Sequence, residues 1–324
     1  MTKLQKPWSA EIGLLRYPNC QLSAVYGLSD LFRIAGEWAT DSTCRVRVTH
    51  WSASKDGALE CIWDSNPGTP HQLDYIIAPP SIVMPSKMQL MPNEADWLRA
   101  NHALGTRICS VCAGAFVLAE SGLLDGRRVT THWAFADTLS KRHSGVEVLA
   151  RNLIVDDGDV ISAGGILAWT DLGLMIVERL FGRSRMLETA RFLVTEPPRS
   201  SQLPFIEFVP TLDHGDDAVL QAQHHIHADI REALTLDQLA ALAGLGRRTF
   251  IRRFAKATSL NPTEYIQHAR IAKARSLLEM TSRPMEQIAW DIGYSDPSAF
   301  RKVFQRICGV SASEYRRQFG MPNG

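Results

Sequence analysis

The sequence predicts two domains, an α/β domain built on a parallel sheet and an all-helical domain after it, and three observations support this. A chain of 324 residues suggests two units at about 150 residues per domain. Charge is segregated, because residues 221–324 carry a net +6 and residues 1–220 a net −5. Four prolines between residues 196 and 213 interrupt regular structure. We therefore expect domains at 9–195 and 221–320, joined by a linker at 196–220.

The first domain alternates short apolar strands with helical stretches. Val, Ile and Leu dominate each expected strand. This alternation predicts a parallel sheet with helices on both faces, a flavodoxin-like sandwich, and ligands bind such sheets at the carboxyl ends of strands. The expected strands are 11–17, 45–51, 75–78, 106–110 and 160–163, and the expected helices include 22–37, 93–104, 113–121 and 170–181.

The second domain contains an internal repeat, since residues 236–265 align with residues 285–315. Each copy has an apolar helical stretch, a glycine turn and a second helix with two phenylalanines four residues apart. Two helices joined by a glycine turn form a helix-turn-helix, so the repeat predicts a double helix-turn-helix domain. The matched pairs include Gly244 with Gly293, Phe250 with Phe300, Phe254 with Phe304, Glu264 with Glu314 and Tyr265 with Tyr315.

The second helix of each copy has a basic outward face. Such a helix can enter the major groove of DNA, where Arg pairs with guanine edges and Lys or Ser contacts bases or phosphates. The helical segment 262–280 can hold the two helices so that they enter successive grooves about 34 Å apart. A solvated basic face on a helical bundle is the alternative. The residues concerned are Arg247, Arg248, Arg252 and Arg253 in the first helix, and Ser298, Arg301, Lys302 and Arg306 in the second.

Residues 235–319 resemble the DNA-binding domain of the AraC/XylS family of transcription regulators. The run IAWDIGYSDPSAFRKVF at 288–304 is similar to that family's second-motif signature nearly throughout. Ile251 departs from the polar residue often found at its position, so we expect a thymine methyl contact or none there. The resemblance implies that base-reading positions fall on Arg248, Ile251 and Arg252, and on Ser298, Arg301 and Lys302.

One strand end of the first domain is chemically conspicuous. The run ICSVCAGA at 108–115 passes from strand directly into helix, with small residues after Cys112. A sharp turn of this kind lifts one side chain over the sheet, and a thiol at a helix start tends toward thiolate. His132 is the imidazole near enough in the sequence to be a partner of the Cys112 thiol. The alternative for Cys112 is a buried small apolar residue, the commoner fate of cysteine.

Three other patterns suggest chemistry that we disfavour. The spacing of Cys109 and Cys112 would suit a redox pair, but Cys109 should point into the sheet. The histidines at 224, 225 and 227 lack a completing ligand set, so we expect a solvated connector and no metal or cofactor site. Six cysteines in a chain this long form no disulfide framework, and we expect reduced thiols.

Residues 9–194 resemble the PfpI-like and class I glutamine amidotransferase-like domains, which are fused to AraC-type modules in GlxA-like regulators. The resemblance is carried by VCAGA at 111–115, GLLDGRRVTTHW at 122–133 and SAGG at 162–165. Enzymes of that superfamily place a Glu against the Cys, and the corresponding position here is Ala24. The resemblance therefore implies an effector pocket for a small amine, amino acid or quaternary ammonium compound. Its candidate residues are Ala24, Cys112, Ala113, His132, Trp133 and Trp169.

Together these patterns predict a sequence-specific regulator, more specifically an activator, that binds double-stranded DNA and responds to a small metabolite. We expect a homodimer formed through the first domain, and RNA polymerase as a partner. One alternative is a Cys112-dependent enzyme of hydratase, amidase or glyoxalase type, and another is a redox sensor that uses Cys112. No apolar run reaches the roughly 18 residues that span a bilayer, so we expect a cytoplasmic protein without membrane contact.

Overall fold

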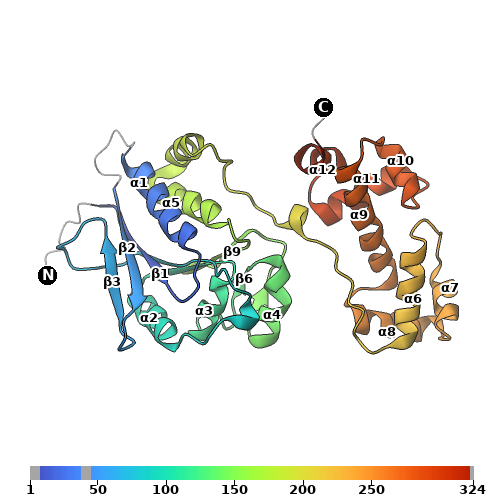
Figure 1. Ribbon diagram of the computed structural model, residues 1–324, viewed down its shortest axis with the longest axis horizontal. Helices are drawn as coiled ribbons and strands as arrows, with labels where there is room; N and C mark the ends of the chain where they lie inside the picture. Colours follow the sequence, from blue (N-terminus) through green and yellow to red (C-terminus); the bar gives the residue numbers. More distant parts are fainter. Residues whose placement is uncertain (1–7, 38–44, 322–324) are drawn as a thin grey trace. The chain divides into compact units, whose positions relative to one another are not determined.

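The computed structural model describes residues 8–37 and 45–321, and it divides into two compact units between Gln202 and Leu203 (Figure 1). Each unit has its own hydrophobic core. Among the described residues, no helix is both long and apolar enough to cross a membrane.

A seven-stranded sheet in the order β3-β2-β1-β4-β5-β9-β8 forms the centre of the first unit. Its five inner strands run parallel, and the edge strands β3 and β8 pair antiparallel. The five predicted strands correspond to the inner strands within two residues, so the predicted parallel sheet is confirmed. The bounds are β1 Ala10–Arg16, β2 Val46–Ala53, β3 Leu59–Asp64, β4 Tyr75–Ala78, β5 Arg107–Val111, β8 Ile154–Asp156 and β9 Val160–Ala163. A separate two-stranded pair joins β6 Arg128–Val129 and β7 Glu147–Val148.

Helices cover both faces of this sheet, as expected for a flavodoxin-like sandwich. Figure 1 shows α1 and α5 on one face and α2, α3 and α4 on the other. Helix α5 is longer than the predicted 170–181, because it continues through a kink at Gly182, whose φ is +84°. The bounds are α1 Leu22–Glu37, α2 Pro92–Ala103, α3 Gly114–Glu120, α4 Ala136–Arg142 and α5 Trp169–Phe192.

The second unit is all-helical and contains two cores, one for each copy of the repeat. The first copy uses α6 Asp217–Ala228, α7 Leu236–Leu242 and α8 Arg247–Thr258. The second uses α10 Met285–Asp291, α11 Pro297–Cys308 and α12 Ala312–Phe319. Between them lies α9, Pro262–Met280, whose first half packs in one core and second half in the other. The predicted double helix-turn-helix is confirmed.

The residues expected as a linker, 196–220, are divided between the two units. On the first unit, the Arg199 guanidinium donates to both carboxylate oxygens of the buried Asp171, at 2.7 and 3.2 Å. On the second, the Arg275 guanidinium donates to the carbonyl oxygens of Pro204, at 2.9 Å, and of Ile206. The part of this segment before residue 203 is therefore bound to the first unit, and the part after residue 202 is bound to the second.

Candidate nucleic-acid interface and thiol pocket

Aromatic cores hold the second helix of each copy in place. Phe250 and Phe254 of α8 are fully buried, as are Phe300 and Phe304 of α11. A tyrosine packs edge-on against the second phenylalanine of each pair, at ring-centroid distances of 5.2 and 5.5 Å. Buried aromatic residues four apart fix one face of a helix, so its opposite face is left to solvent.

The glycine turns and caps are also repeated. Gly244 and Gly293 have φ of +63° and +84°, a conformation that L side chains rarely adopt. At Gly293, an added Cβ would lie 2.7 Å from the carbonyl oxygen of Arg231. Capping boxes, in which two side chains satisfy the backbone N–H groups of a helix start, occur at α7 (Thr235, Gln238), α9 (Asn261, Glu264) and α12 (Ser311, Glu314).

The predicted base-reading residues are mostly solvent-exposed. Arg248, Arg252, Ser298, Arg301 and Lys302 are exposed, and Ile251 is half-buried. Two predicted cations pair with acids at the surface, since an Arg301 guanidinium nitrogen lies 2.6 Å from a Glu286 carboxylate oxygen and one of Arg247 lies 3.4 Å from Asp237. Exposed pairs of this kind contribute little stability, so these guanidinium groups remain accessible to another anion.

Two residues of the predicted basic faces are tied to the protein. Arg253 donates to both carboxylate oxygens of Asp216, at 2.8 and 2.7 Å, and Asp216 is itself the N-cap of α6. This bidentate pair lowers the pKa of the Asp216 carboxyl and fixes α8 against α6. Arg306 donates to Gln267 of α9 at 2.5 Å. The expectation of an outward Arg253 is corrected, because its position lies over the start of α6.

Helix α9 connects the two helix-turn-helix units rigidly. Tyr265 and Ala269 belong to the first core, whereas Ile271, Ala274 and Leu278 belong to the second. The helix has 19 residues, a rise of about 28 Å at 1.5 Å per residue. Because both cores share one continuous helix, the exposed faces of α8 and α11 are held at a fixed separation.

In the first unit, Cys112 sits at a strained turn between β5 and α3. Its φ is +54°, which is uncommon outside glycine. The backbone passes very close to β4 here, since a Cβ on Gly114 would lie 2.3 Å from the carbonyl oxygen of Ala78. The Thr131 hydroxyl donates to the Cys112 carbonyl oxygen at 2.7 Å. The predicted elbow geometry is therefore present.

The state of the thiol differs from our expectation of a thiolate. Cys112 is 2% exposed, and burial raises the pKa of its thiol to about 12. The backbone N–H groups of Ala113 and His132 lower that pKa, but by less than burial raises it. The expectation is wrong because removing the charged sulfur from water costs more than these two donors return. Cys109, with a fully buried side chain, likewise has its pKa raised to about 12 by burial.

His132 contacts the thiol through its backbone. Its ring nitrogen Nδ1 accepts from the backbone N–H of Ala134 at 3.2 Å, and the imidazole packs against the rings of Trp133 and Phe135. Burial lowers the pKa of His132, which favours a neutral ring. Such an imidazole is not arranged as the general base of a cysteine nucleophile.

Gln202, which sequence reasoning missed, organises the loop that carries His132. Its side-chain carbonyl accepts from the backbone N–H of Trp133 at 3.1 Å. Its amide nitrogen lies 2.9 to 3.1 Å from three carbonyl oxygens, which share its two N–H donors and belong to Thr131, Ala150 and Asn152. A Cβ on Gly164 would lie 2.1 Å from that nitrogen, which explains the glycine there. No spacing pattern indicated Gln202, because it lies about 70 residues after the loop it holds.

The two remaining pocket candidates lie around α1. Ala24 is fully buried, so the position of the enzymes' acid is occupied by a methyl group within the packed core. Trp169 is half-buried and lies over Gly27, where an added Cβ would be 2.4 Å from its ring. The Trp169 indole nitrogen is buried without a hydrogen-bond partner among the described residues.

A cavity of about 570 Å³ opens beside the carboxyl ends of β1 and β2. Its lining includes Arg16, Tyr17, Cys20 and Glu94, and none of the six predicted pocket residues. Tyr17 lies between this cavity and Cys112 in its interactions. Burial raises the pKa of the Tyr17 hydroxyl, and the thiols of Cys20 and Cys112 raise that pKa further. Glu94 is only 5% exposed, so this cavity contains a charged group shielded from bulk water.

The chain matches two family models and several curated proteins. Residues 239–318 match a helix-turn-helix domain family, and residues 54–179 match the DJ-1/PfpI family. The transcriptional regulator ArgR of Pseudomonas aeruginosa is 31% identical over 216 residues, 66% of this chain and 65% of that protein. The chain thus spans just under two thirds of the length of ArgR.

Two further relatives represent different activities. The transcriptional regulator GlxA of Rhizobium meliloti is 29% identical over 226 residues, 69% of each chain. An isonitrile hydratase of Pseudomonas putida is 33% identical over 110 residues, 34% of this chain and 45% of that enzyme. The chain thus combines a helix-turn-helix domain of the AraC type with a domain of the DJ-1/PfpI kind, and it is similar to transcriptional regulators.

Proposed function

We propose that the chain is a sequence-specific DNA-binding transcription regulator, an activator that works as a homodimer with RNA polymerase. The observation that carries this proposal is the pair of exposed basic helix faces on α8 and α11, both packed on α9. Two such helices can read two segments of major groove at once. Arg248 and Arg252 would contact DNA in one groove, and Ser298, Arg301 and Lys302 in the next.

Selection from a pool of random double-stranded DNA tests this function with the full chain. We expect one enriched sequence that binds at least about 10³-fold more tightly than its scrambled version at the same salt concentration. The affinity should fall linearly with salt on a logarithmic scale, because phosphate contacts release counterions. Equal affinity for enriched and scrambled DNA would contradict the proposal.

The effector that we propose is an amino acid or another small amine, bound in the cavity beside β1 and β2. Its volume, about 570 Å³, lies in the range of small-molecule sites. Arg16 can pair with a ligand carboxylate and Glu94 with an ammonium group, and both line the cavity. Neither side chain makes a hydrogen bond or ion pair with the residues that the structure describes. This arrangement favours a zwitterion over an uncharged metabolite.

A thermal-shift screen of amino acids, amines and quaternary ammonium compounds tests the effector. A ligand present at 100 times its Kd should stabilise the protein by about 2.7 kcal/mol. Glu94→Gln should remove the response to cationic ligands, and Arg16→Gln the preference for those that also bear a carboxylate. The conservative Asp56→Asn exchange, outside the cavity lining, is the control. Unchanged responses in both cavity variants would exclude this site.

An enzyme that uses Cys112 is the competing function, and the partial likeness to an isonitrile hydratase favours it. Against it stand the protonated thiol, the engaged His132 ring and the alanine at position 24. Turnover assays on isonitriles, amides and α-oxoaldehydes should show no activity that depends on Cys112. Turnover abolished by Cys112→Ala would establish the enzyme instead.

A further inference from the structure

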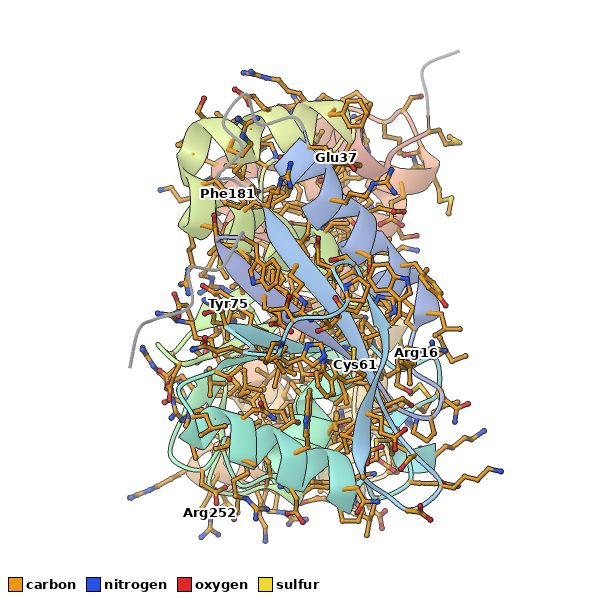
Figure 2. The ribbon with its side chains drawn as sticks, turned by 90° about the vertical axis from the view of Figure 1, so that its left-hand side faces the viewer. Arg16, Glu37, Cys61, Tyr75, Phe181 and Arg252 are labelled. Atoms are coloured by element: carbon orange, nitrogen blue, oxygen red, sulfur yellow. The ribbon has the colours of Figure 1, made fainter. Side chains whose placement is uncertain are left out.

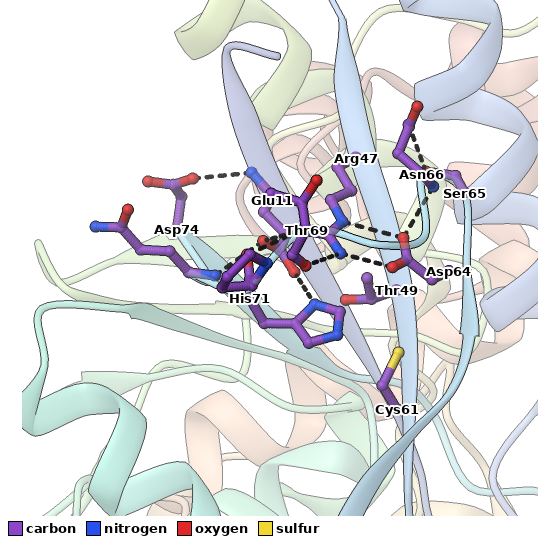
Figure 3. A network of polar contacts seen from close by, with 12 residues as sticks. Glu11, Arg47, Thr49, Cys61, Asp64, Ser65, Asn66, Thr69, His71 and Asp74 are labelled. Atoms are coloured by element: carbon purple, nitrogen blue, oxygen red, sulfur yellow. Dashed lines mark hydrogen bonds and ion pairs between the residues drawn. The ribbon is translucent and has the colours of Figure 1, made fainter. Parts of the chain in front are cut away.

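A cluster of side chains at the β3 edge of the first unit lies apart from both sites described above. Sulfur, carboxylate and imidazole ligand atoms of Cys61, Asp64 and His71 all lie within 4.8 Å of one another. Figure 2 looks toward the side of the molecule on which Cys61 lies, and Figure 3 shows the cluster from close by. We propose that Cys61, Asp64 and His71 bind a divalent transition-metal ion of the zinc class.

A β-bulge brings the first two ligands together. Residues three apart in a regular strand point to opposite faces. Here the pairing shifts between His50 and Trp51, so that Cys61 lies opposite Trp51 and Asp64 opposite Thr49. Directly opposed residues share a face, and the extra residue of a bulge therefore places Cys61 and Asp64 on the same face.

A buried carboxylate orients the third ligand. Glu11 is fully buried, and its Oε1 lies 2.7 Å from His71 Nδ1. A carboxylate only accepts hydrogen bonds, so Nδ1 carries the proton and Nε2 retains its lone pair. Nε2 has no hydrogen bond to any part of the chain that the structure describes. A carboxylate behind a histidine is the usual arrangement at protein metal sites, where it fixes the ring and raises its basicity.

The surrounding charges suit a dication. Arg47, fully buried, donates to both Asp64 oxygens, at 3.0 and 2.6 Å, and to Glu11 at 3.3 Å. Asp64 Oδ1 also accepts from the backbone N–H of Asn66 at 2.9 Å, so the second lone pair that remains for an ion is on Oδ2. Glu11, Asp64 and Arg47 sum to one negative charge, and a Cys61 thiolate adds a second. A divalent ion would make the site neutral.

Binding includes one chemical step at the sulfur. The Cys61 S–H bond breaks as the metal–sulfur bond forms, and the proton leaves to buffer, so no electron transfer is involved. Cys61 is half-buried and the His71 side chain is 31% exposed, which gives an ion access from solvent. Water would complete a four-coordinate site with three protein ligands.

The ligand types favour zinc over magnesium or calcium. Thiolate and imidazole suit zinc and its neighbours, whereas magnesium and calcium take oxygen ligands. Sequence spacing did not indicate the site, because the bulge and the Glu11 contact are needed to gather its members.

Titration of the metal-free, full-length protein tests the proposal with Zn²⁺ by calorimetry and with Co²⁺ by absorption. We expect one ion per chain, a charge-transfer band from cobalt–thiolate bonding, and a raised melting temperature with Zn²⁺. Cys61→Ser should abolish the cobalt–thiolate band, and Cys61→Ser and His71→Gln should each weaken Zn²⁺ binding at least about tenfold.

Two control variants separate this site from other candidates. Cys308→Ala removes a buried thiol of the second unit, and His224→Gln alters the histidine-rich stretch of α6. Both should leave the thiolate band and the affinity unchanged. The proposal is overturned if no ion binds, or if binding with wild-type affinity persists in both Cys61→Ser and His71→Gln. Melting curves without metal confirm that each variant is folded.

Discussion

The two helix-turn-helix copies share their cores but differ at the start of the second helix. The N-cap of helix α11 is Asp296, whose carboxylate accepts from the backbone N–H groups of Ser298 and Ala299 at 2.8 and 3.2 Å. The N-cap of helix α8 is Gly246, which has no side chain to accept from the helix start. The repeated core therefore determines the fold of each copy, while the residue that caps the second helix differs between the copies.

The copies also differ in how their arginines are held. Arg253 of α8 is bound to Asp216, whereas the side chains of Arg248 and Arg252 make no hydrogen bond or ion pair with the described residues. In α11, Arg301 pairs with Glu286. DNA must compete with Glu286 for the Arg301 guanidinium, so the first helix is better prepared to bind and the second helix is better capped.

The largest expected effect concerns the feature that the copies share. Phe254→Ala and Phe304→Ala should each lower the free energy of unfolding by about 3–5 kcal/mol, since both side chains are fully buried. Denaturant unfolding of the full chain, followed by helix-sensitive circular dichroism, measures the loss. A loss below about 1 kcal/mol in either copy would show that its core is not packed as described.

The next effect concerns DNA. Arg252→Ala should weaken binding to the selected sequence by about 1–3 kcal/mol, which is about 5- to 150-fold. Arg301→Ala should cost less, because the free protein loses the Glu286 ion pair at the same time. Gel-shift titration measures both, with Lys273→Ala on the exposed side of α9 as the charge-matched control. If all three variants lose the same DNA affinity, the loss reflects the protein's net charge and not specific contacts by Arg252 and Arg301.

The capping difference predicts a smaller, asymmetric effect. Asp296→Ala should destabilise the protein by about 0.5–2 kcal/mol, whereas Gly246→Ser should stabilise it by only a few tenths of a kcal/mol. A Cβ at Gly246 meets no atom within 4 Å, so the serine fits. Thermal and urea unfolding provide the comparison. If Asp296→Ala is neutral, the cap does not contribute to α11.

The smallest effect is a pH dependence confined to the first copy. The Tyr265 hydroxyl oxygen lies 2.8 Å from His227 Nε2, and burial together with the nearby His224 lowers the pKa of His227. The unfolded chain therefore binds protons more readily, so this stability is present above about pH 6.5 and declines as the pH falls below it.

Hydrogen exchange can detect this localised decline. On acidification, amides of α6 should exchange faster relative to those of α12, where Tyr315 bonds to Arg275 and Glu279 instead. His227→Gln should flatten the response of α6. Equal acceleration of both helices would contradict the assignment to His227.

Much of the fold was predictable, because its signals are local. Both glycine turns, the four phenylalanines and the helix 22–37 follow from short-range spacing, and the structure confirms them. Strands β3 and β8 were missed, since they are edge strands in which most positions are half-buried or exposed. The pattern that marks a buried inner strand is weak in such segments.

The thiol pocket was less predictable, because distant residues determine its properties. The spacing around Cys112 predicted the turn but not the raised pKa of its thiol, which depends on how completely the surrounding chain covers it. Gln202, which holds the His132 loop, and Tyr17, which interacts with the Cys112 thiol, lie near opposite ends of the first unit's sequence. Of the expected reduced cysteines, five are free thiols, and Cys44 lies outside the described residues.

Hydroxyl-radical footprinting of the full chain on its selected DNA sequence tests the central claim most directly. If α9 holds the two recognition helices at a fixed separation, each copy of the protein should protect two segments about 34 Å apart, one helical turn of DNA. Arg252→Ala should weaken protection of one segment, and Arg301→Ala that of the other. A single protected segment, or the same segment weakened by both substitutions, would contradict the account.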